Sequence, residues 1–135
     1  MNRIAKIFQP ALIMIFAVSV TIAGNPKGKS LYFQQITLDS KCALVGKLPL
    51  NEGSLKNVSY YRFVYDETAM LDKVEYLNGG KTQADPFFGV AQILIDYNDG
   101  YEKRSYVNEK GKPTSDNLSG VYSVRLKMNS KGIPV

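Results

Sequence analysis

The sequence predicts an all-β domain: an antiparallel sheet or a stack of β-hairpins, built from degenerate repeats of about 32 residues and preceded by an N-terminal signal helix. Three observations predict this fold. The segments YLNGGKTQADPFFGVAQIL (76–94) and YVNEKGKPTSDNLSGVYSV (106–124) share landmark residues in the same order. Apolar and polar residues alternate in segments such as SVRLKM (123–128), as in strands with one solvated face. Gly, Pro, Asn and Asp gather between these segments, as in turns.

Residues 1–24 are predicted to be a signal peptide or an N-terminal anchor. Arg3 and Lys6 precede an uncharged, mostly apolar stretch at residues 11–23, which ends in small residues. This is the layout of a secretory signal peptide, and the apolar stretch is short for a membrane span. Cleavage after Ala23 or Gly24 and retention as an anchor are the two targeting alternatives, and a buried helix of the domain is the third. In both targeting alternatives, residues 25–135 form one β-repeat domain outside the cytoplasm, and a membrane is contacted only through residues 1–24 if they are not cleaved.

The first predicted strand pair occupies residues 31–45. Its apolar residues do not follow a single alternation, because Leu31 and Phe33 are out of phase with Ile36 and Leu38. We therefore expect a bulge or a bend near residues 34–35.

The repeat period follows from three sets of landmarks that recur at steps of 31 to 34 residues. They are the Gly-Lys pairs beginning at Gly46, Gly80 and Gly111, the pairs ending in Val that begin at Asn57, Gly89 and Gly120, and the strand ends at Tyr65, Tyr97 and Met128. Several independent landmarks that keep one spacing indicate an internal repeat.

Each unit is expected to contain a strand, a turn, a second strand and a loop. Asp99-Gly100 is a strong hairpin signal because Gly adopts positive φ at low cost, whereas residues 66–70 have no Gly and predict a looser turn. Second strands are expected near residues 73–77 and 103–107. A lone hairpin is marginally stable, so the units must pair and bury one face. The expected equivalent buried positions are Tyr61, Ile93 and Val124, followed by Phe63, Ile95 and Leu126.

The segment GVAQILIDYNDGYEKRSYVNEKGKPTSDNLS (89–119) resembles the tandem Tyr-Asp-type repeats of exported bacterial proteins, which are related to RHS repeats. The shared order is Gly, strand, Tyr-Asp, turn Gly, strand, Tyr and Gly-Lys-Pro, and the resemblance covers residues 46–135. Two departures are the missing turn Gly in residues 66–70 and Met128 in place of Tyr. The resemblance implies extracytoplasmic β-rich repeats and brings no catalytic residues.

Composition favours a protein without enzymatic activity, cofactor or nucleic-acid partner. The formal net charge is +5, without a long run of Lys and Arg, which is typical of a solvated mixed-charge surface. The sequence contains no His, the commonest metal ligand and general base near neutral pH. One Cys cannot form an internal disulfide.

The acidic residues offer two further candidates for chemistry. Residues 96–102 carry four oxygen-bearing side chains suited to calcium, but their spacing departs from the EF-hand, and a plain hairpin turn is favoured. Asp66, Glu67, Asp72, Glu75 and Asp85 are expected to be solvated in turns and at strand edges, since nothing in the sequence brings two of them into one pocket. No metal site is therefore predicted.

Cys42 is predicted to pack with residues 43–45 as a small hydrophobic residue. Lys41 lies beside it, which leaves a reactive thiol, an intermolecular disulfide or a metal contact as alternatives.

Six residues are candidates for partner contact: Phe87, Phe88, Tyr101, Val124, Leu126 and Met128. The Tyr residues favour half-buried packing between strands over exposed platforms for sugars or peptides. The Phe pair either forms an exposed patch or fills the space between hairpins. Residues 124–128 are expected to be an edge strand that a partner or a second copy extends, unless residues 31–38 fold back and cover it.

Together these patterns predict an exported, non-enzymatic β-repeat protein with a binding or structural role in the cell envelope or extracellular space, secreted or periplasmic. Its partner would be an envelope or extracellular protein or a glycan, and self-association is a further expectation. The alternatives are a membrane-anchored envelope subunit and a secreted hydrolase or hydrolase inhibitor.

Overall fold

The structure is a computed structural model that describes residues 26–135, and the predicted signal peptide lies outside the described residues. Residues 26–135 form one antiparallel sheet of eight strands, which confirms the all-β prediction. The strands are β1 (Ser30–Leu38), β2 (Leu44–Leu50), β3 (Ser59–Tyr65), β4 (Leu71–Asn78), β5 (Lys81–Thr82), β6 (Gln92–Asn98), β7 (Tyr101–Val107) and β8 (Ser123–Lys127). A single 3-10 turn, η1 (Glu52–Ser54), precedes β3. No helix in the described part of the chain is long and apolar enough to span a membrane.

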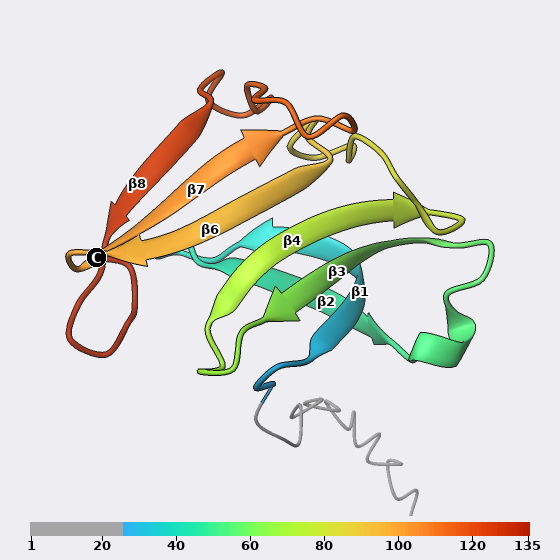
Figure 1. Cartoon of the computed structure of the whole chain (residues 1–135), viewed down its shortest axis with the longest axis horizontal. Coiled ribbons are helices and arrows are strands. Elements are labelled where there is room, and N and C mark those ends of the chain that lie inside the picture. The colour runs from blue at the N-terminus through green and yellow to red at the C-terminus, as the bar shows by residue number, and fades with distance from the viewer. Residues whose placement is uncertain (1–25) are drawn as a thin grey trace, which may run out of the picture.

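The strand order is β2-β1-β3-β4-β6-β7-β8, and the short β5 pairs with β4 (Figure 1). From β3 onward the order follows the sequence. The first hairpin is reversed, because β1 and not β2 lies next to β3. The alternative that residues 31–38 pair with β8 is therefore wrong: β1 lies between β2 and β3, and in the described part of the chain β8 pairs only with β7.

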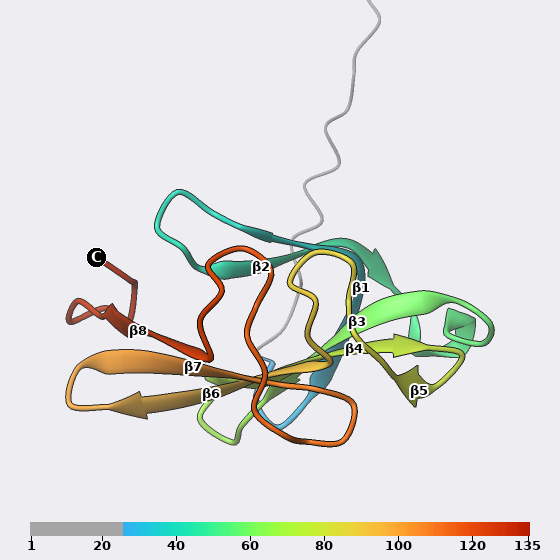
Figure 2. The ribbon, with the colours of Figure 1, turned by 90° about the horizontal axis from the view of Figure 1, so that it is seen from above.

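The sheet curls so that β1 and β2 form a second layer behind β4 and β6 (Figures 1 and 2). The hydrophobic core lies between the two layers. Its buried members come from both ends of the chain: Phe33, Ile36, Tyr61, Phe63, Val74, Phe88, Val90, Ile93, Ile95 and Tyr106. We call the side of the sheet that faces this core the inner face, and the opposite side the outer face.

The predicted alternation is confirmed in the central strands and only partly in β8. Ile93 and Ile95 are buried on the inner face, while Asp96 is exposed on the outer face. Val124 and Leu126, expected to be equally buried, are only half-buried. The reason is that β8 is an edge strand with a neighbour on one side only.

The predicted turns are confirmed. Asp99 and Gly100 both have positive φ, at 51° and 74°, in a two-residue hairpin. The looser turn at residues 66–70 is closed by a side chain: Oδ1 of Asp66 accepts N–H bonds from Thr68 and Met70 at 2.8 and 3.0 Å. Ala69 takes the left-handed conformation there, with φ of 66°.

The turn at residues 66–70 recurs three more times, and we call it the five-residue turn. In each, Oδ1 of the first residue accepts the N–H groups of the third and fifth, and the fourth residue has positive φ. The other three turns span residues 39–43, 108–112 and 129–133. Asp and Asn suit the first position because their short side chains replace a backbone acceptor.

One landmark of the predicted period was wrong. Gly46-Lys47 lies inside β2, whereas Gly80-Lys81 and Gly111-Lys112 lie at turns. The landmark residues Asn57, Gly89 and Gly120 all have positive φ, at 63°, 72° and 69°. The bulge expected near residues 34–35 is absent, because β1 and β2 pair in one continuous register. The break in alternation is real: Phe33 and Ile36 are both buried and the two residues between them are exposed.

Candidate functional site

Glu75, predicted to be solvated, is buried, with 4% of its surface exposed. Its carboxylate accepts hydrogen bonds from Arg62 Nε at 2.7 Å and Gln92 Nε2 at 3.0 Å, and it forms an ion pair with Lys73 at 2.8 Å. Burial opposes the charge, but the bonds from Lys73 and Arg62 outweigh it and hold the pKa of Glu75 below its ordinary value. Its partners are cations and an amide from its own strand and from the two neighbouring strands, so Glu75 stabilises the sheet.

Asp85, also predicted to be solvated, is buried and organises the loop before β6. Its carboxylate accepts the N–H groups of Phe88 and Val90 and the hydroxyl of Tyr61, the last at 2.9 Å. Burial and the neighbouring Asp85 charge raise the pKa of Tyr61 far above its ordinary value. The buried Asp116 plays the same part in the next loop, where it accepts N–H bonds from Leu118 and Ser119.

The four acidic and amide groups considered for calcium do not converge. Asp96 and Asn98 lie on the outer face, whereas Glu102 is buried on the inner face and bonded to Arg104. Asp99 forms the turn. Within residues 26–135, no three acidic or Cys side chains are placed to hold a metal ion.

Cys42 is exposed, so its predicted packing as a small hydrophobic residue is wrong. It occupies the fourth position of the first five-residue turn, with φ of 62°. The residue lies at the end of the first hairpin, where it borders an apolar groove while remaining exposed.

An apolar groove runs along the inner face of β8, and we call it the inner groove. Its volume is about 150 Å³. One wall is the end of the first hairpin and the other is β8 with the preceding loop: Leu38, Cys42, Leu44, Leu118, Ser119, Val124 and Leu126. Phe88, Ile93, Arg104, Tyr106 and Asp116 complete the lining. The groove is therefore mostly apolar, with polar groups between its walls.

The backbone of β8 is open along the outer edge of the sheet. The C=O of Tyr122 accepts the N–H of Tyr106 in β7 at 3.1 Å, and the N–H of Met128 donates to the C=O of Gly100 in the β6–β7 turn at 2.8 Å. In an antiparallel pair these directions alternate, so residues 123, 125 and 127 point their backbone groups away from β7. The N–H of Val135 donates a hydrogen bond of 2.9 Å to the C=O of Lys127, so this carbonyl is already paired. In the described part of the chain, nothing pairs with Ser123 and Arg125 on that side.

The structure brings together only some of the six predicted contact residues. Val124 and Leu126 line the inner groove, and Phe88 lies in it with 3% of its surface exposed. Phe87 is 40% exposed and packs edge-on against Phe88. Tyr101 and Met128 lie elsewhere, in a hollow beside the β6–β7 turn. The opposite wall of the groove, Leu38 and Leu44, was missed because the sequence does not show that the first hairpin folds over β8.

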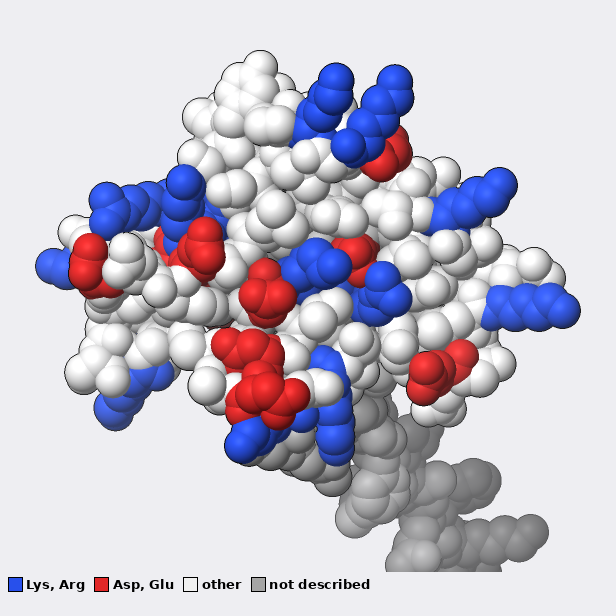
Figure 3. All heavy atoms as spheres, in the orientation of Figure 1, with Lys and Arg blue, Asp and Glu red and all other residues white. Residues whose placement is uncertain are grey.

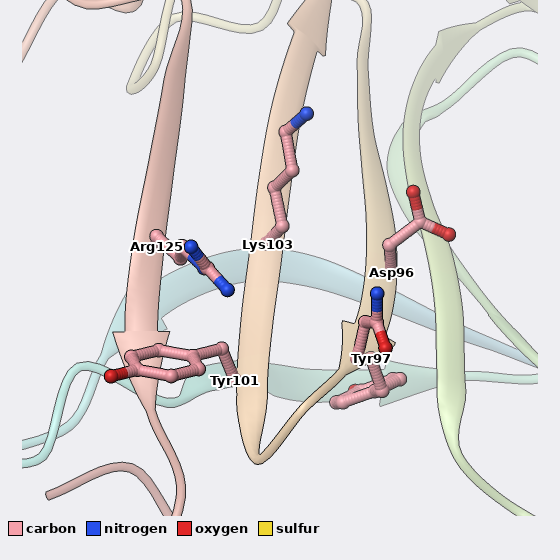
Figure 4. Close-up of a pocket in the computed structure, with 6 residues that line it drawn as sticks. Asp96, Tyr97, Tyr101, Lys103 and Arg125 are labelled. Atoms are coloured by element: carbon pink, nitrogen blue, oxygen red, sulfur yellow. The ribbon is translucent and has the colours of Figure 1, made fainter.

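A second hollow lies on the outer face of β6, β7 and β8, and we call it the outer hollow. It is open, with a volume of about 650 Å³, and is lined by Asp96, Tyr97, Asn98, Tyr101, Lys103 and Arg125 (Figure 4). Acidic and basic side chains are interspersed over this face of the molecule (Figure 3).

No protein-family model, curated protein or solved structure matches the chain. Function is therefore inferred from the geometry of the inner groove, the β8 edge and the outer hollow.

Proposed function

We propose that the chain is an exported, non-enzymatic β-repeat protein that binds a partner by strand addition to β8. The observation that carries this proposal is that the open backbone edge and the inner groove belong to the same strand. A partner strand added beyond β8 bonds to Ser123 and Arg125 through its main chain. Its inward side chains then lie beside Val124 and Leu126, facing the wall formed by the first hairpin.

The chemistry of β8 also selects the partner. Inner-face residues of the added strand contact an apolar groove, whereas its outer-face residues lie beside the side chains of Arg125 and Lys127. The fitting segment therefore alternates apolar and acidic residues over about one strand length. A partner of this kind in the cell envelope or extracellular space agrees with the signal-peptide pattern of residues 1–24.

The repeat origin of the chain is part of this proposal. The recurring five-residue turn and the shared positive φ of Asn57, Gly89 and Gly120 support copies of one ancestral unit. So does the resemblance of residues 89–119 to RHS-like repeats. Each copy presents its first strand to the preceding unit, so a further strand is the natural neighbour of β8.

The test uses a capped seven-residue peptide of alternating Val and Glu, observed by NMR of the folded chain. We expect the amide signals of Ser123 and Arg125 to shift on titration. Two N-methylated versions of the peptide provide matched controls, because only one of the two alternating sets of amides faces β8. Binding should be lost with one version and kept with the other.

Equal binding of both methylated peptides would contradict strand addition. Shifts confined to residues outside β8 would contradict it as well. If Ser123 became protected on concentrating the chain alone, the edge would belong to a second copy of this protein.

Export is tested separately by intact mass spectrometry of the protein recovered from the producing cell. We expect a chain that begins at residue 24 or 25. A full-length chain in the membrane fraction would support the anchored alternative, and a cytoplasmic chain that begins at Met1 would overturn export.

A further inference from the structure

The outer hollow has a regular arrangement of side chains across three strands. One row runs Asp96, Lys103, Arg125 and the next runs Asn98, Tyr101, Lys127, each row formed by directly paired residues of β6, β7 and β8. Oxygen acceptors therefore lie on one side of the hollow and cations on the other.

Lys103 and Arg125 face each other directly across β7 and β8, an arrangement that is destabilising in the absence of an anion. Among residues 26–135, no acidic group lies within ion-pair distance of either cation. Figure 4 shows the Lys103 side chain extending along its strand instead of toward Asp96. Both cations are therefore available to a ligand.

Arg125 is held in place by an aromatic ring. Its guanidinium carbon lies 4.2 Å from the ring centre of Tyr101. Stacking of this kind uses the face of the guanidinium and leaves the N–H groups along its edge free to bind a carboxylate with two parallel bonds. Tyr101 therefore reduces the conformational freedom that Arg125 loses on binding.

We propose that the outer hollow binds an acidic saccharide, with Arg125 and Lys103 holding the carboxylate of a uronic acid and Asp96 and Asn98 accepting hydrogen bonds from its hydroxyl groups. The acceptors distinguish this ligand from other anions. A phosphodiester has no hydroxyl donor to offer Asp96 or Asn98, so it uses only the cationic side of the hollow. A uronic acid supplies both the anion and the donors within one sugar ring.

The probe is a trimer of galacturonic acid, titrated into the folded chain by calorimetry with NMR to locate the site. Its methyl ester keeps every ring hydroxyl but removes the charges, and inorganic phosphate supplies an anion without the ring hydroxyls of a sugar. We expect shifts at residues 96–103 and 123–127 with the acid, and an affinity at least about tenfold lower for the ester and for phosphate. Equal affinity for the acid and the ester, or tighter binding of phosphate, would overturn the proposal.

Two charge-matched variants complete the test. Arg125→Gln removes a ligand-binding cation but keeps the backbone edge of β8, whereas Lys131→Gln removes an exposed cation from the last turn. We expect Arg125→Gln to weaken binding of the trimer by about tenfold or more and Lys131→Gln to leave it nearly unchanged, with both melting temperatures close to that of the parent. Equal losses in both variants would assign the binding to net charge and contradict the site. Because the peptide test of strand addition uses backbone groups, either proposal can fail without the other.

Discussion

Glu75 connects three strands through one carboxylate. Oε2 accepts the bond from Arg62 on β3, while Oε1 receives Gln92 from β6 and Lys73 from β4 itself. A charge buried to this extent is tolerated only when it is paired, and removing it leaves its donors without an acceptor.

We expect Glu75→Gln to lower the free energy of unfolding by about 1.5–3 kcal/mol at neutral pH, because it removes charge-assisted hydrogen bonds. The folded-state pKa of Glu75 lies below its unfolded value, so its contribution is complete above the unfolded pKa of about 4.3. That contribution is lost as pH falls through the folded pKa. Urea unfolding from pH 7 to pH 3 should therefore show the gap between parent and variant closing below about pH 4.3.

Asp72→Asn is the matched control on the same strand, since Asp72 is exposed. Its effect should stay within about 0.5 kcal/mol. A Glu75→Gln variant no less stable than Asp72→Asn would show that the buried carboxylate is not stabilising.

Buried apolar residues could be predicted from the sequence, but buried polar ones could not. Ile93 and Ile95 follow from alternation alone. The same alternation places Glu75 on the outer face, where a charge is expected to be solvated. Its burial depends on Arg62 and Gln92, which come from two other strands. No local pattern reports such a pairing.

At the scale of elements, the five-residue turn accepts a residue other than Gly at a position with positive φ, because a side chain at its first position stabilises the turn. The left-handed fourth position is Gly in the turns at residues 108–112 and 129–133, but Cys42 and Ala69 in the other two. In every case Oδ1 of the Asp or Asn at the first position accepts two backbone N–H groups and so stabilises the turn.

We expect Ala69→Gly to raise the free energy of unfolding by up to about 1 kcal/mol, because relief of left-handed strain exceeds the added flexibility of the unfolded chain. Gly111→Ala should lower it by about 1 kcal/mol in the equivalent turn. A Cβ at Gly111 meets no atom within 4 Å, so the effect reports conformation alone. Chemical denaturation of both variants measures the difference, and changes of the same sign would disprove the equivalence of the turns.

The alternation of β6 gives a second element-scale prediction. Ile95→Asp places an unpaired charge among core residues and should cost several kcal/mol, enough to unfold the domain. Asp96→Lys, one residue further and exposed, should change stability by about 0.5 kcal/mol or less. Thermal unfolding followed by circular dichroism compares them. Similar losses would mean that both faces of β6 are covered.

The positions of β3, β4, β6, β7 and β8 were predictable because period-two patterns and turn residues mark them, whereas the short β5 lies in a segment expected to be a loop. The order of the first hairpin was not. Both β1 and β2 carry apolar residues, and nothing local decides which of them pairs with β3. Gly46-Lys47 misled for the same reason, since a Gly-Lys pair inside a strand looks identical to one at a turn.

For the whole molecule, the central feature is a sheet that curls without closing. We predict that the β8 amides exchange with solvent in alternation: Val124 and Leu126 slowly, because they pair with β7, and Ser123 and Arg125 quickly. Hydrogen exchange of the dilute chain, read by NMR, measures this. Protection of all four amides that persists on dilution would mean that β8 has a second neighbour within the chain.

Only one wall of the inner groove, the β8 side, could be predicted from the sequence. The sequence identifies Val124 and Leu126 as inward residues of an edge strand. Leu38 and Leu44 reach the same groove through the curl of the sheet, which depends on how eight strands twist together.

The reversed first hairpin also makes the two ends of the domain differ in their resistance to a pulling force. A pulling force on residue 29 acts on β1, which is bonded to β2 on one side and β3 on the other, so two ladders must fail before the strand leaves the sheet. A force on residue 135 acts on β8, which has one ladder and can be peeled away one bond at a time. Tension applied between these ends should therefore detach β8 first, while β1 remains paired with β2 and β3.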